Sequence, residues 1–471
     1  MNIEKTQLTI KNQEQYCGQI SYCRHLPGQE ASYAAPKEPL SPVIRDCLAA
    51  EGINRLYAHQ AAALDAVRDG NNIVVVTPTA SGKTLCYNLP VLSALVADKK
   101  ARALYLFPTK ALTQDQLTTV DGFGLVPAAV YDGDTPDTAK AAIREQARVV
   151  LTNPDMLHLG ILPNHLKWHE FFSQLRFVVI DEIHTYRGVF GTQVAHVIRR
   201  LRRLAREHGA DPQFILTSAT IANPKQHAER LTGLPVTLIA GSGAPQGERN
   251  FIFWQVPAPR TYLSEAVWLL QVLLAERART IAFARARQVV ERMLRRVQQT
   301  APEPLGQQIM AYRGGYLPAE RRAIEKALFS GRLLGVVATN ALELGIDVGA
   351  MDVCLIAGYP GTIASTWQQA GRVGRRERPS LVIFIAVANP LDQYFLRHPE
   401  VFFDKPTESA LIDTANPYLL LGQARCAAQE LPLSTQDLSL WDPVLLDLLT
   451  ILEEDGEVTQ GDGRWFYVGQ D

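Results

Sequence analysis

The stretch that decides the fold is Thr77-Pro78-Thr79-Ala80-Ser81-Gly82-Lys83-Thr84, which directly follows the apolar run Ile73-Val74-Val75-Val76. The apolar run predicts a buried strand, and the stretch after it predicts a loop that turns into a helix. Such a loop presents backbone N–H groups to the phosphates of a nucleotide, with a lysine for their charge and a hydroxyl for Mg²⁺. Lys83 and Thr84 fit these roles. Taken alone, the stretch could also be an ordinary strand, turn and helix.

A pair of acidic residues follows a second apolar run. Phe177-Val178-Val179-Ile180 ends in Asp181-Glu182-Ile183-His184. In a P-loop ATPase, a carboxylate at the end of a strand holds Mg²⁺ and a neighbouring one polarises the attacking water, which fits Asp181 and Glu182 respectively. Two acids at a strand end can also simply be solvated, but the phosphate-binding loop upstream favours the ATPase interpretation.

The composition is that of a folded protein with several domains. The chain has 471 residues, of which 47% are hydrophobic and 20% charged, and at roughly 100 to 200 residues per domain this suggests about three domains. Its 47 Lys and Arg balance 48 Asp and Glu, so any polyanion must be held by a local basic groove. The polar N-terminus and the short apolar run at residues 381–388 predict a cytoplasmic protein without a membrane span.

The six cysteines do not predict a metal site or disulfides. None of them forms a CxxC pair, and a chain of this size does not need disulfides for stability. Cys17, Cys23 and His25 come nearest to a metal cluster, but their loose spacing favours an ordinary surface segment. We therefore expect reduced thiols.

Apolar runs that alternate with helical segments predict an α/β fold with parallel sheets from residue 56 onward. Strands are expected at residues 73–76, 103–107, 149–152, 177–180, 214–217, 280–283, 335–338, 353–356 and 381–387. A Gly/Pro-rich stretch at 241–247 resembles a linker. The predicted domains are an N-terminal extension (1–55), a nucleotide-binding domain (56–240), a second α/β domain (241–410) and a small C-terminal module (411–471).

The C-terminal module combines leucine-rich helices with a predicted β-hairpin. Gly461-Asp462-Gly463 lies between two β-prone runs, which is a strong hairpin signal. Helices followed by a hairpin predict a winged-helix-like module, and a plain helical cap is the alternative. Alternation along the second strand places Trp465 and Tyr467 on one face and Phe466 on the other.

The order of the motifs resembles superfamily 2 helicases. The loop and the acidic pair are followed by Ser218-Ala219-Thr220, and then by Gln368-Gln369-Ala370-Gly371-Arg372-Val373-Gly374-Arg375. The resemblance implies two tandem RecA-like domains. It also implies that Gln368, Arg372 and Arg375 act on the γ-phosphate from the second domain, where arginine suits developing phosphate charge.

The same resemblance implies the remaining site residues. Gln60 would recognise adenine in ATP, whereas Tyr57 would either stack on the base or belong to the core. The other implied residues fall into four groups. They are the phosphate loop (Thr79, Ala80, Ser81, Gly82, Lys83 and Thr84), the nucleotide contacts Gly345 and Asp347, the nucleic-acid contacts Pro108, Thr109, Lys110, Arg313, Gly314 and Thr339, and the coupling residues His184, Ser218 and Thr220. Contacts of the third group would hold the backbone without reading bases.

A narrower likeness is visible in three segments. Residues 79–83, 181–191 and 365–372 look like the DEAH-type DNA repair helicases of the MrfA/YprA group, relatives of the RecQ-four-like helicases. The group implies ATP and Mg²⁺ as cofactors, 3′ to 5′ movement on single-stranded DNA or a 3′-tailed duplex, and repair with a nuclease partner. Its members carry a further C-terminal domain with a four-cysteine zinc site, which we do not expect in this chain. The alternatives are an RNA helicase, because backbone contacts barely distinguish sugars, and a nucleic-acid-binding scaffold without turnover.

Overall fold

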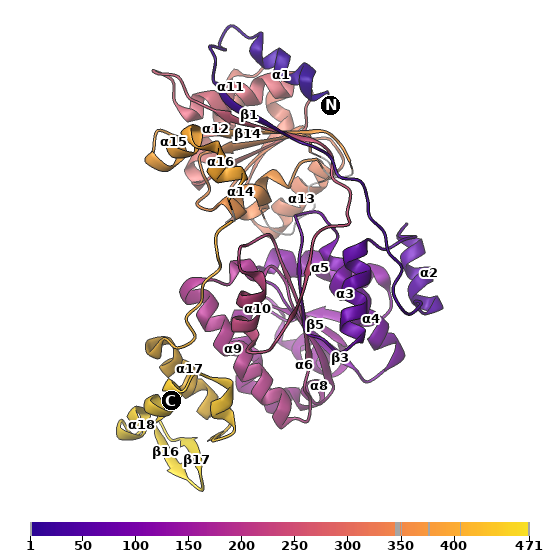
Figure 1. The fold of residues 1–471 in the computed structure, drawn as a ribbon, viewed down its shortest axis with the longest axis vertical. Coiled ribbons are helices and arrows are strands. Elements are labelled where there is room, and N and C mark those ends of the chain that lie inside the picture. Colours follow the sequence, from indigo (N-terminus) through magenta and orange to yellow (C-terminus); the bar gives the residue numbers. More distant parts are fainter. Residues whose placement is uncertain (1, 344–348, 350, 375–376, 406, 470–471) are drawn as a thin grey trace. The chain divides into compact units, whose positions relative to one another are not determined.

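The computed structural model describes residues 2–343, 349, 351–374, 377–405 and 407–469 (Figure 1). It divides into two compact units. We call the first the β2 unit, which comprises Tyr33–Thr77, Gly82–Ser242 and Ser409–Asp471. The second is the β12 unit, which comprises Met1–Ser32, Pro78–Ser81 and Gly243–Glu408. Within the described residues, no helix has the length and apolar composition needed to cross a membrane.

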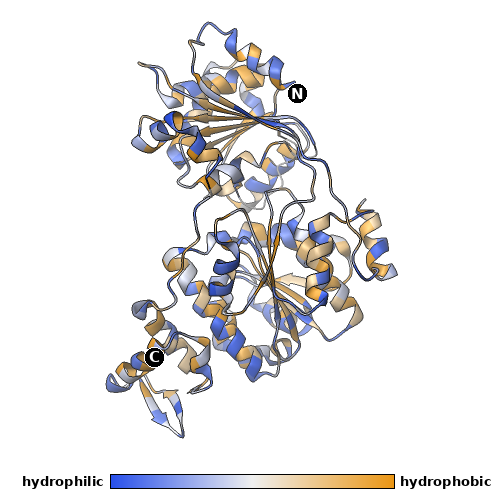
Figure 2. Ribbon diagram, viewed as in Figure 1, coloured by the Kyte–Doolittle hydropathy of each residue, from blue (hydrophilic) through white to orange (hydrophobic). Residues whose placement is uncertain are grey.

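A seven-stranded parallel sheet forms the centre of the β2 unit. Its strands, in spatial order, are β4 (Ala128–Val130), β5 (Val149–Thr152), β3 (Arg102–Leu106), β6 (Leu175–Ile180), β7 (Gln213–Ser218), β2 (Ile73–Val76) and β8 (Thr237–Ala240). Val74 and Val76 pack into one hydrophobic core, whereas Ile73 and Val75 pack into another on the opposite face. Burial on both faces explains why central strands such as β2 are continuous apolar runs, coloured orange in Figure 2.

Helices cover both faces of this sheet (Figure 1). They are α2 (Pro42–Ala50), α3 (Ala58–Arg68), α4 (Lys83–Ala97), α5 (Lys110–Phe123), α6 (Asp137–Gln146), α8 (His169–Ser173), α9 (Gly188–Glu207) and α10 (Pro224–Thr232), with the short turn α7 (Pro154–Met156). The five strands predicted for this domain are all present, and β2 and β5 have the predicted bounds.

The β12 unit contains a second seven-stranded sheet. Its strands, in spatial order, are β1 (Ile20–Leu26), β9 (Arg249–Trp254), β14 (Ser380–Ile385), β13 (Val353–Ala357), β10 (Thr280–Ala284), β12 (Gly335–Ala338) and β11 (Ile309–Tyr312). Its helices are α1 (Ile3–Lys11), α11 (Tyr262–Ala275), α12 (Arg287–Thr300), α13 (Pro318–Phe329), α14 (Ile363–Ala370), α15 (Pro390–Arg397) and α16 (Pro399–Phe403). Among the described residues of this sheet, the strand pairs are parallel except β1 with β9.

The N-terminal segment does not form one extension, because it is divided between the units after Ser32. Strand β1 pairs antiparallel with β9, in a register that places Tyr22 opposite Phe253. The ring centroids of these two residues lie 6.0 Å apart. This pairing covers the edge of the second sheet, which would otherwise expose unpaired backbone groups. The chain also passes between the units at 77–78, 81–82, 242–243 and 408–409, and the last two passages lie close to the predicted boundaries at residues 240 and 410.

The C-terminal module belongs to the β2 unit. It contains α17 (Pro417–Glu430), α18 (Val444–Glu454) and a three-stranded antiparallel sheet of β15 (Leu433–Ser434), β17 (Arg464–Tyr467) and β16 (Val458–Gly461). The predicted hairpin is confirmed. Trp465 is 5% exposed and packs in the core of the module, whereas Phe466 is 38% exposed, as the alternation predicts.

Candidate nucleotide and nucleic-acid site

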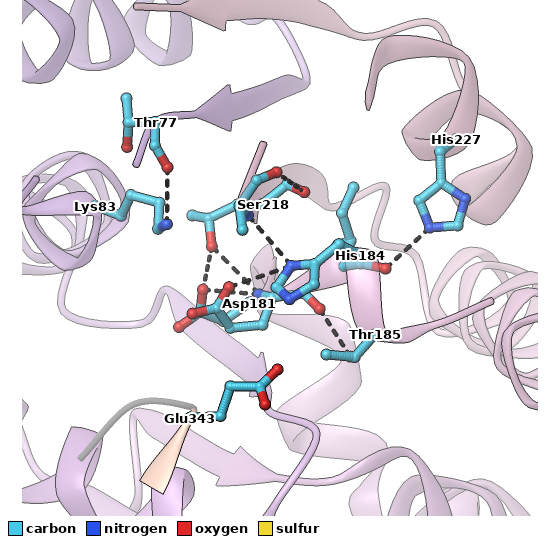
Figure 3. A network of polar contacts seen from close by, with 12 residues as sticks. Thr77, Lys83, Asp181, His184, Thr185, Ser218, His227 and Glu343 are labelled. Atoms are coloured by element: carbon cyan, nitrogen blue, oxygen red, sulfur yellow. Dashed lines mark hydrogen bonds and ion pairs between the residues drawn. The ribbon is translucent and has the colours of Figure 1, made fainter. Parts of the chain in front are cut away.

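The phosphate-binding loop connects the end of β2 to the start of α4. Lys83 is the first residue of α4, and its Nζ donates to the backbone carbonyl of Thr77 at 3.1 Å (Figure 3). Gly82 caps the helix in the left-handed conformation, with φ of +79°, and Ala80 also has a positive φ of +61°. The N–H groups at a helix start are free to meet an anion. These two left-handed residues produce the turn from β2 into α4, and phosphate binding by the loop stays a prediction.

Gln60 links this loop to the start of α3. Its Nε2 donates to the carbonyl of Gly82 at 3.1 Å, and its Oε1 accepts from the backbone N–H of Tyr57 at 3.0 Å. The ring of Tyr57 is stacked with those of Tyr33 and His59, at centroid distances of 5.4 and 6.0 Å. Gln60 therefore lies against the loop, and the adenine roles of Gln60 and Tyr57 stay predictions.

The acidic pair lies at the carboxyl end of β6, beside the end of β7. Asp181 and Glu182 are both buried, and Glu182 has a left-handed φ of +52°. Asp181 Oδ1 accepts from the backbone N–H of Glu182 at 2.8 Å and from the hydroxyl of Thr217. Figure 3 shows these contacts close to Lys83. Burial, and then the charge of Glu182, raise the pKa of Asp181 to about 6, so a cation beside this carboxylate would stabilise its charged form.

His184 connects the acidic pair to the segment after β7. Its Nδ1 accepts from the backbone N–H of Ala219 at 3.2 Å and lies 3.4 Å from Glu182 Oε2. Burial lowers the pKa of His184 to about 4, so the imidazole is neutral near pH 7 and its Nδ1 can accept. The buried Ser218 donates its hydroxyl to the carbonyl of Ala219 at 2.7 Å, whereas Thr220 is exposed. His184 thus contacts the segment that follows β7, and the coupling roles of His184, Ser218 and Thr220 stay predictions.

Three residues of this site were missed by the sequence analysis. Thr217 donates to Asp181, as described above, and Tyr87 lies with its hydroxyl 3.5 Å from Asp181 Oδ2. Tyr87 also donates to Gln116 Oε1 at 2.8 Å. The position of Thr217 at the end of a strand next to β6 could have indicated its role. No periodic signal marks Tyr87 or Gln116, which come from two different helices.

The predicted nucleic-acid contacts of the β2 unit lie where β3 ends and α5 begins. Pro108 and Thr109 follow the strand, and the hydroxyl of Thr109 caps α5 by accepting from Leu112 N at 3.3 Å. Lys110 is exposed and its Nζ lies 2.8 Å from a carboxylate oxygen of Asp134. A surface pair of this kind contributes little energy, so Lys110 can exchange it for a phosphate.

The predicted nucleic-acid contacts of the β12 unit lie at the ends of β11 and β12. Thr339 follows β12 and donates its backbone N–H to the carbonyl of Tyr312 at 3.2 Å. Arg313 Nε lies 2.6 Å from Glu291 Oε1. Arg287, at the start of α12, was missed by the sequence analysis, and its guanidinium lies 3.3 Å from the position of a Cβ added to Gly314. Arg287 therefore adds positive charge beside this predicted backbone contact.

Within the β12 unit, Glu343 accepts hydrogen bonds from α14 and from the predicted arginine motif. Its carboxylate accepts from Ser365 Oγ at 2.5 Å and from Gln369 Nε2 at 2.9 Å. Its backbone carbonyl accepts from the guanidinium of Arg372 at 2.5 Å. Gln368 and Arg372 are each 4% exposed. Glu343 was not among the predicted residues. Gly345, Asp347 and Arg375 lie outside the described residues, so their roles stay predictions.

The sequence that carries these motifs matches the models of two known protein families. "DEAD/DEAH box helicase" matches residues 57–227, and "Helicase conserved C-terminal domain" matches residues 264–377. The chain belongs to the DEAD/DEAH-box helicases. The predicted membership of superfamily 2 and its likeness to the MrfA/YprA group are thereby confirmed.

Several helicases resemble this chain over nearly its whole length. The ATP-dependent helicase YprA of Bacillus subtilis (strain 168) is 47% identical over 455 residues, which make up 94% of this chain and 61% of YprA. The ATP-dependent helicase HRQ1 of Saccharomyces cerevisiae (strain ATCC 204508 / S288c) is 38% identical over 90% of this chain and 42% of its own length. The chain thus spans about three fifths or less of these relatives.

A crystal structure of the helicase MrfA bound to DNA and AMPPNP has the same fold. It is 44% identical, with a TM-score of 0.93, and the match covers 99% of this chain and 66% of that one. The predicted fold class, two RecA-like sheets with a small C-terminal module, is confirmed for this DEAD/DEAH-box helicase. Among its described residues, no group of three or more His, Cys, Asp and Glu side chains could hold a metal ion.

Proposed function

We propose that the chain is a DNA-dependent ATPase that moves 3′ to 5′ along single-stranded DNA and separates strands in DNA repair. The observation that carries the proposal is the buried pair Asp181 and Glu182, which lies beside Lys83 and is joined through His184 to the segment after β7. A structural relative with 44% identity is bound to DNA and to AMPPNP, which supports DNA and ATP as the ligands.

We assign a different role in ATP hydrolysis to each of several residues of the β2 unit. Lys83 and the N–H groups at the start of α4 bind the phosphates of ATP. Asp181 and Thr84 offer the oxygen ligands that Mg²⁺ prefers, and this cation, when bound, neutralises phosphate charge. Glu182 orients the attacking water and accepts its proton. Thr217 holds Asp181 in place through its hydroxyl.

The residues of the β12 unit act on the γ-phosphate and on the nucleic-acid backbone. We assign Gln368, Arg372 and Arg375 to the phosphate, because guanidinium groups form paired hydrogen bonds with phosphate oxygens. Gly345 and Asp347 would contact the nucleotide from the same unit. The DNA backbone would be held by Thr339, Arg313 and Gly314, and in the β2 unit by Pro108, Thr109 and Lys110. These groups contact phosphate without reading sequence.

One experiment tests the proposal directly. The ATPase rate is measured with no nucleic acid, with single-stranded DNA and with RNA of the same sequence, and strand separation is measured on duplexes with a 3′ or a 5′ tail. We expect stimulation by DNA above RNA and separation of the 3′-tailed duplex only. Stimulation by RNA alone would instead identify an RNA helicase, and ATP-independent binding without turnover would identify a scaffold.

A further inference from the structure

A short segment connects the β12 unit to the C-terminal module. We call residues 408–413 the strap. Glu408 is the last residue of the β12 unit in this part of the chain, and Ser409 is the first of the β2 unit. The strap is held at both ends, and the contacts of each end lie within the unit to which that end belongs.

The first anchor is the carboxylate of Glu408, which lies at the start of α14. Its Oε1 accepts from the N–H of Ile363 at 2.6 Å, and its Oε2 accepts from the N–H of Ala364 at 3.2 Å. The hydroxyl of Tyr359 donates to Oε1 at 3.0 Å. The first N–H groups of a helix have no partner within it, and a negative charge there is favourable. Glu408 thereby fixes the helix that carries Gln368.

The second anchor is Asn223, whose side chain pairs with the backbone of Ala410 in both directions. Asn223 Oδ1 accepts from Ala410 N at 2.8 Å, and Nδ2 donates to Ala410 O at 3.0 Å. The carbonyl of Leu411 accepts from Gly188 N at 2.7 Å. Ile412 is 6% exposed and packs into the core of the β2 unit. These contacts leave Ser409 as the residue between the two anchors.

The second anchor contacts the two segments of the chain that follow the residues of the proposed hydrolysis site. Gly188 begins α9, which follows the acidic pair and His184, and Asn223 precedes α10, which follows Ser218-Ala219-Thr220. His227, in α10, has its Nε2 2.9 Å from the carbonyl of Ile183. A displacement of the strap would therefore act on the backbone next to Glu182 and on the segment after β7.

We propose that the strap is a coupling element, in which Glu408 and Asn223 are positioning residues. It joins the helix that carries Gln368 to the segments that carry Glu182 and Ser218, with one residue between the anchors. A movement of either unit when nucleic acid binds is then transmitted to the acidic pair, because a short chain held at both ends has little slack. This inference rests on the proposed function, since it assumes hydrolysis that nucleic acid stimulates.

The test is to lengthen the strap while both anchors remain. Two glycines are inserted after Ser409, and ATPase rates with and without single-stranded DNA are compared with those of the unaltered chain. We expect unchanged melting temperature, basal ATPase rate and DNA affinity in the absence of nucleotide, but a roughly tenfold loss of stimulation, within the usual range of coupling between sites. A purely structural strap would keep its stimulation, because no anchoring hydrogen bond is removed. That result would overturn the inference.

Two substitutions make the test independent of how the insertion folds. Glu408→Gln and Asn223→Ala each weaken one anchor. Asn2→Ala serves as the control, because Asn2 is also a hydrogen-bonding asparagine and caps α1 by accepting from Lys5 N at 3.0 Å. We expect loss of stimulation in the first two variants only. A fall in melting temperature without loss of stimulation would overturn the inference. Failure of DNA and RNA to stimulate the unaltered chain would instead contradict the proposed function.

Discussion

The roles that we propose for Lys83 and Glu182 differ, and substitutions should separate them. Lys83→Ala removes the positive charge that meets the phosphates, so ATP binding should weaken. Glu182→Gln keeps the shape of the side chain but cannot accept a proton, so ATP should still bind while hydrolysis slows by about a hundredfold or more. Binding of a fluorescent ATP analogue and steady-state ATPase rates measure the two effects. Near-normal turnover in both variants would contradict the ATPase assignment.

The raised pKa of Asp181 predicts that the ionised carboxylate lowers the free energy of unfolding by an amount that depends on pH. Burial and the charge of Glu182 raise this pKa to about 6, whereas an unfolded aspartate titrates near about 4. The folded state therefore binds the proton more tightly, and the free energy of unfolding rises as the pH falls through about 6 toward 4. At neutral pH the ionised carboxylate is destabilising.

Asp181→Asn should remove this cost, because the amide oxygen can still accept from Glu182 N and from Thr217. Without nucleotide, the variant should be more stable than the unaltered chain at pH 7.5, on the order of 1 to 3 kcal/mol at about 1.4 kcal/mol per pKa unit. The difference should shrink by pH 5. Denaturant unfolding at the two pH values measures it, and a difference that is equal at both would contradict the assigned pKa.

At the scale of elements, α9 holds the C-terminal module through buried arginines. Arg200 forms an ion pair with Glu430 whose side chains are 0% and 2% exposed, and Arg203 donates to the carbonyls of Ala427, Leu431 and Pro432 at 2.6 to 2.7 Å. Glu430→Ala leaves the Arg200 charge buried without its carboxylate, so the free energy of unfolding should fall by about 3 to 5 kcal/mol. Calorimetry or denaturant unfolding measures the loss.

The matched control is a more exposed ion pair of the same module. Arg425 and Glu457 are 41% and 29% exposed at the side chain, so Glu457→Ala should cost about 1 kcal/mol or less. Equal losses in the two variants would mean that the buried pair does not hold the module on α9.

The exposed face of the hairpin should act on the duplex without affecting hydrolysis. Phe466 and Arg464 are exposed on β17, whereas Trp465 packs in the module core. Phe466→Ala should impair separation of a 3′-tailed duplex severalfold and leave DNA-stimulated ATPase intact. Trp465→Ala should instead destabilise the module by about 3 to 5 kcal/mol. Unimpaired strand separation by the Phe466 variant would contradict a role for the hairpin in opening the duplex.

These elements also show which parts of the fold the sequence could predict. The strands β2 and β5 were predicted with correct bounds because strands buried on both faces are continuous apolar runs. The strand β1 was missed because its side chains alternate between partly buried and exposed, and its partner β9 lies more than two hundred residues away in the chain. The buried arginines of α9 were missed because an arginine-rich helix usually faces solvent, whereas here its partners come from the distant C-terminal module.

Site residues could be predicted where a single stretch of sequence contains both a recognisable strand and the reactive side chains that follow it. Lys83, Asp181 and Glu182 each follow a recognisable apolar strand, and the comparisons support the family to which these motifs belong. Glu343 and Glu408 could not be predicted, because their partners come from α14, distant in the sequence. Contacts between distant segments depend on packing, which a local pattern does not specify.

At the scale of the whole molecule, the balance of charge gives no general attraction to DNA, so local cations determine how DNA binding depends on salt. The net charge is −1, so we expect affinity for single-stranded DNA to come from a few local cations, and we propose Lys110 and Arg287 among them. Each phosphate neutralised on a single strand contributes about −0.7 to the slope of log affinity against log salt concentration. Lys110→Ala should make the slope less negative by about 0.7 and weaken binding equally for all sequences.

The control is Lys100, which is also exposed but precedes β3 in the sequence, whereas Lys110 follows it. Lys100→Ala should leave the slope unchanged. Fluorescence anisotropy titrations at four or more salt concentrations measure both. An unchanged slope in the Lys110 variant would mean that the backbone N–H and hydroxyl groups of this segment, rather than its lysine, hold the DNA.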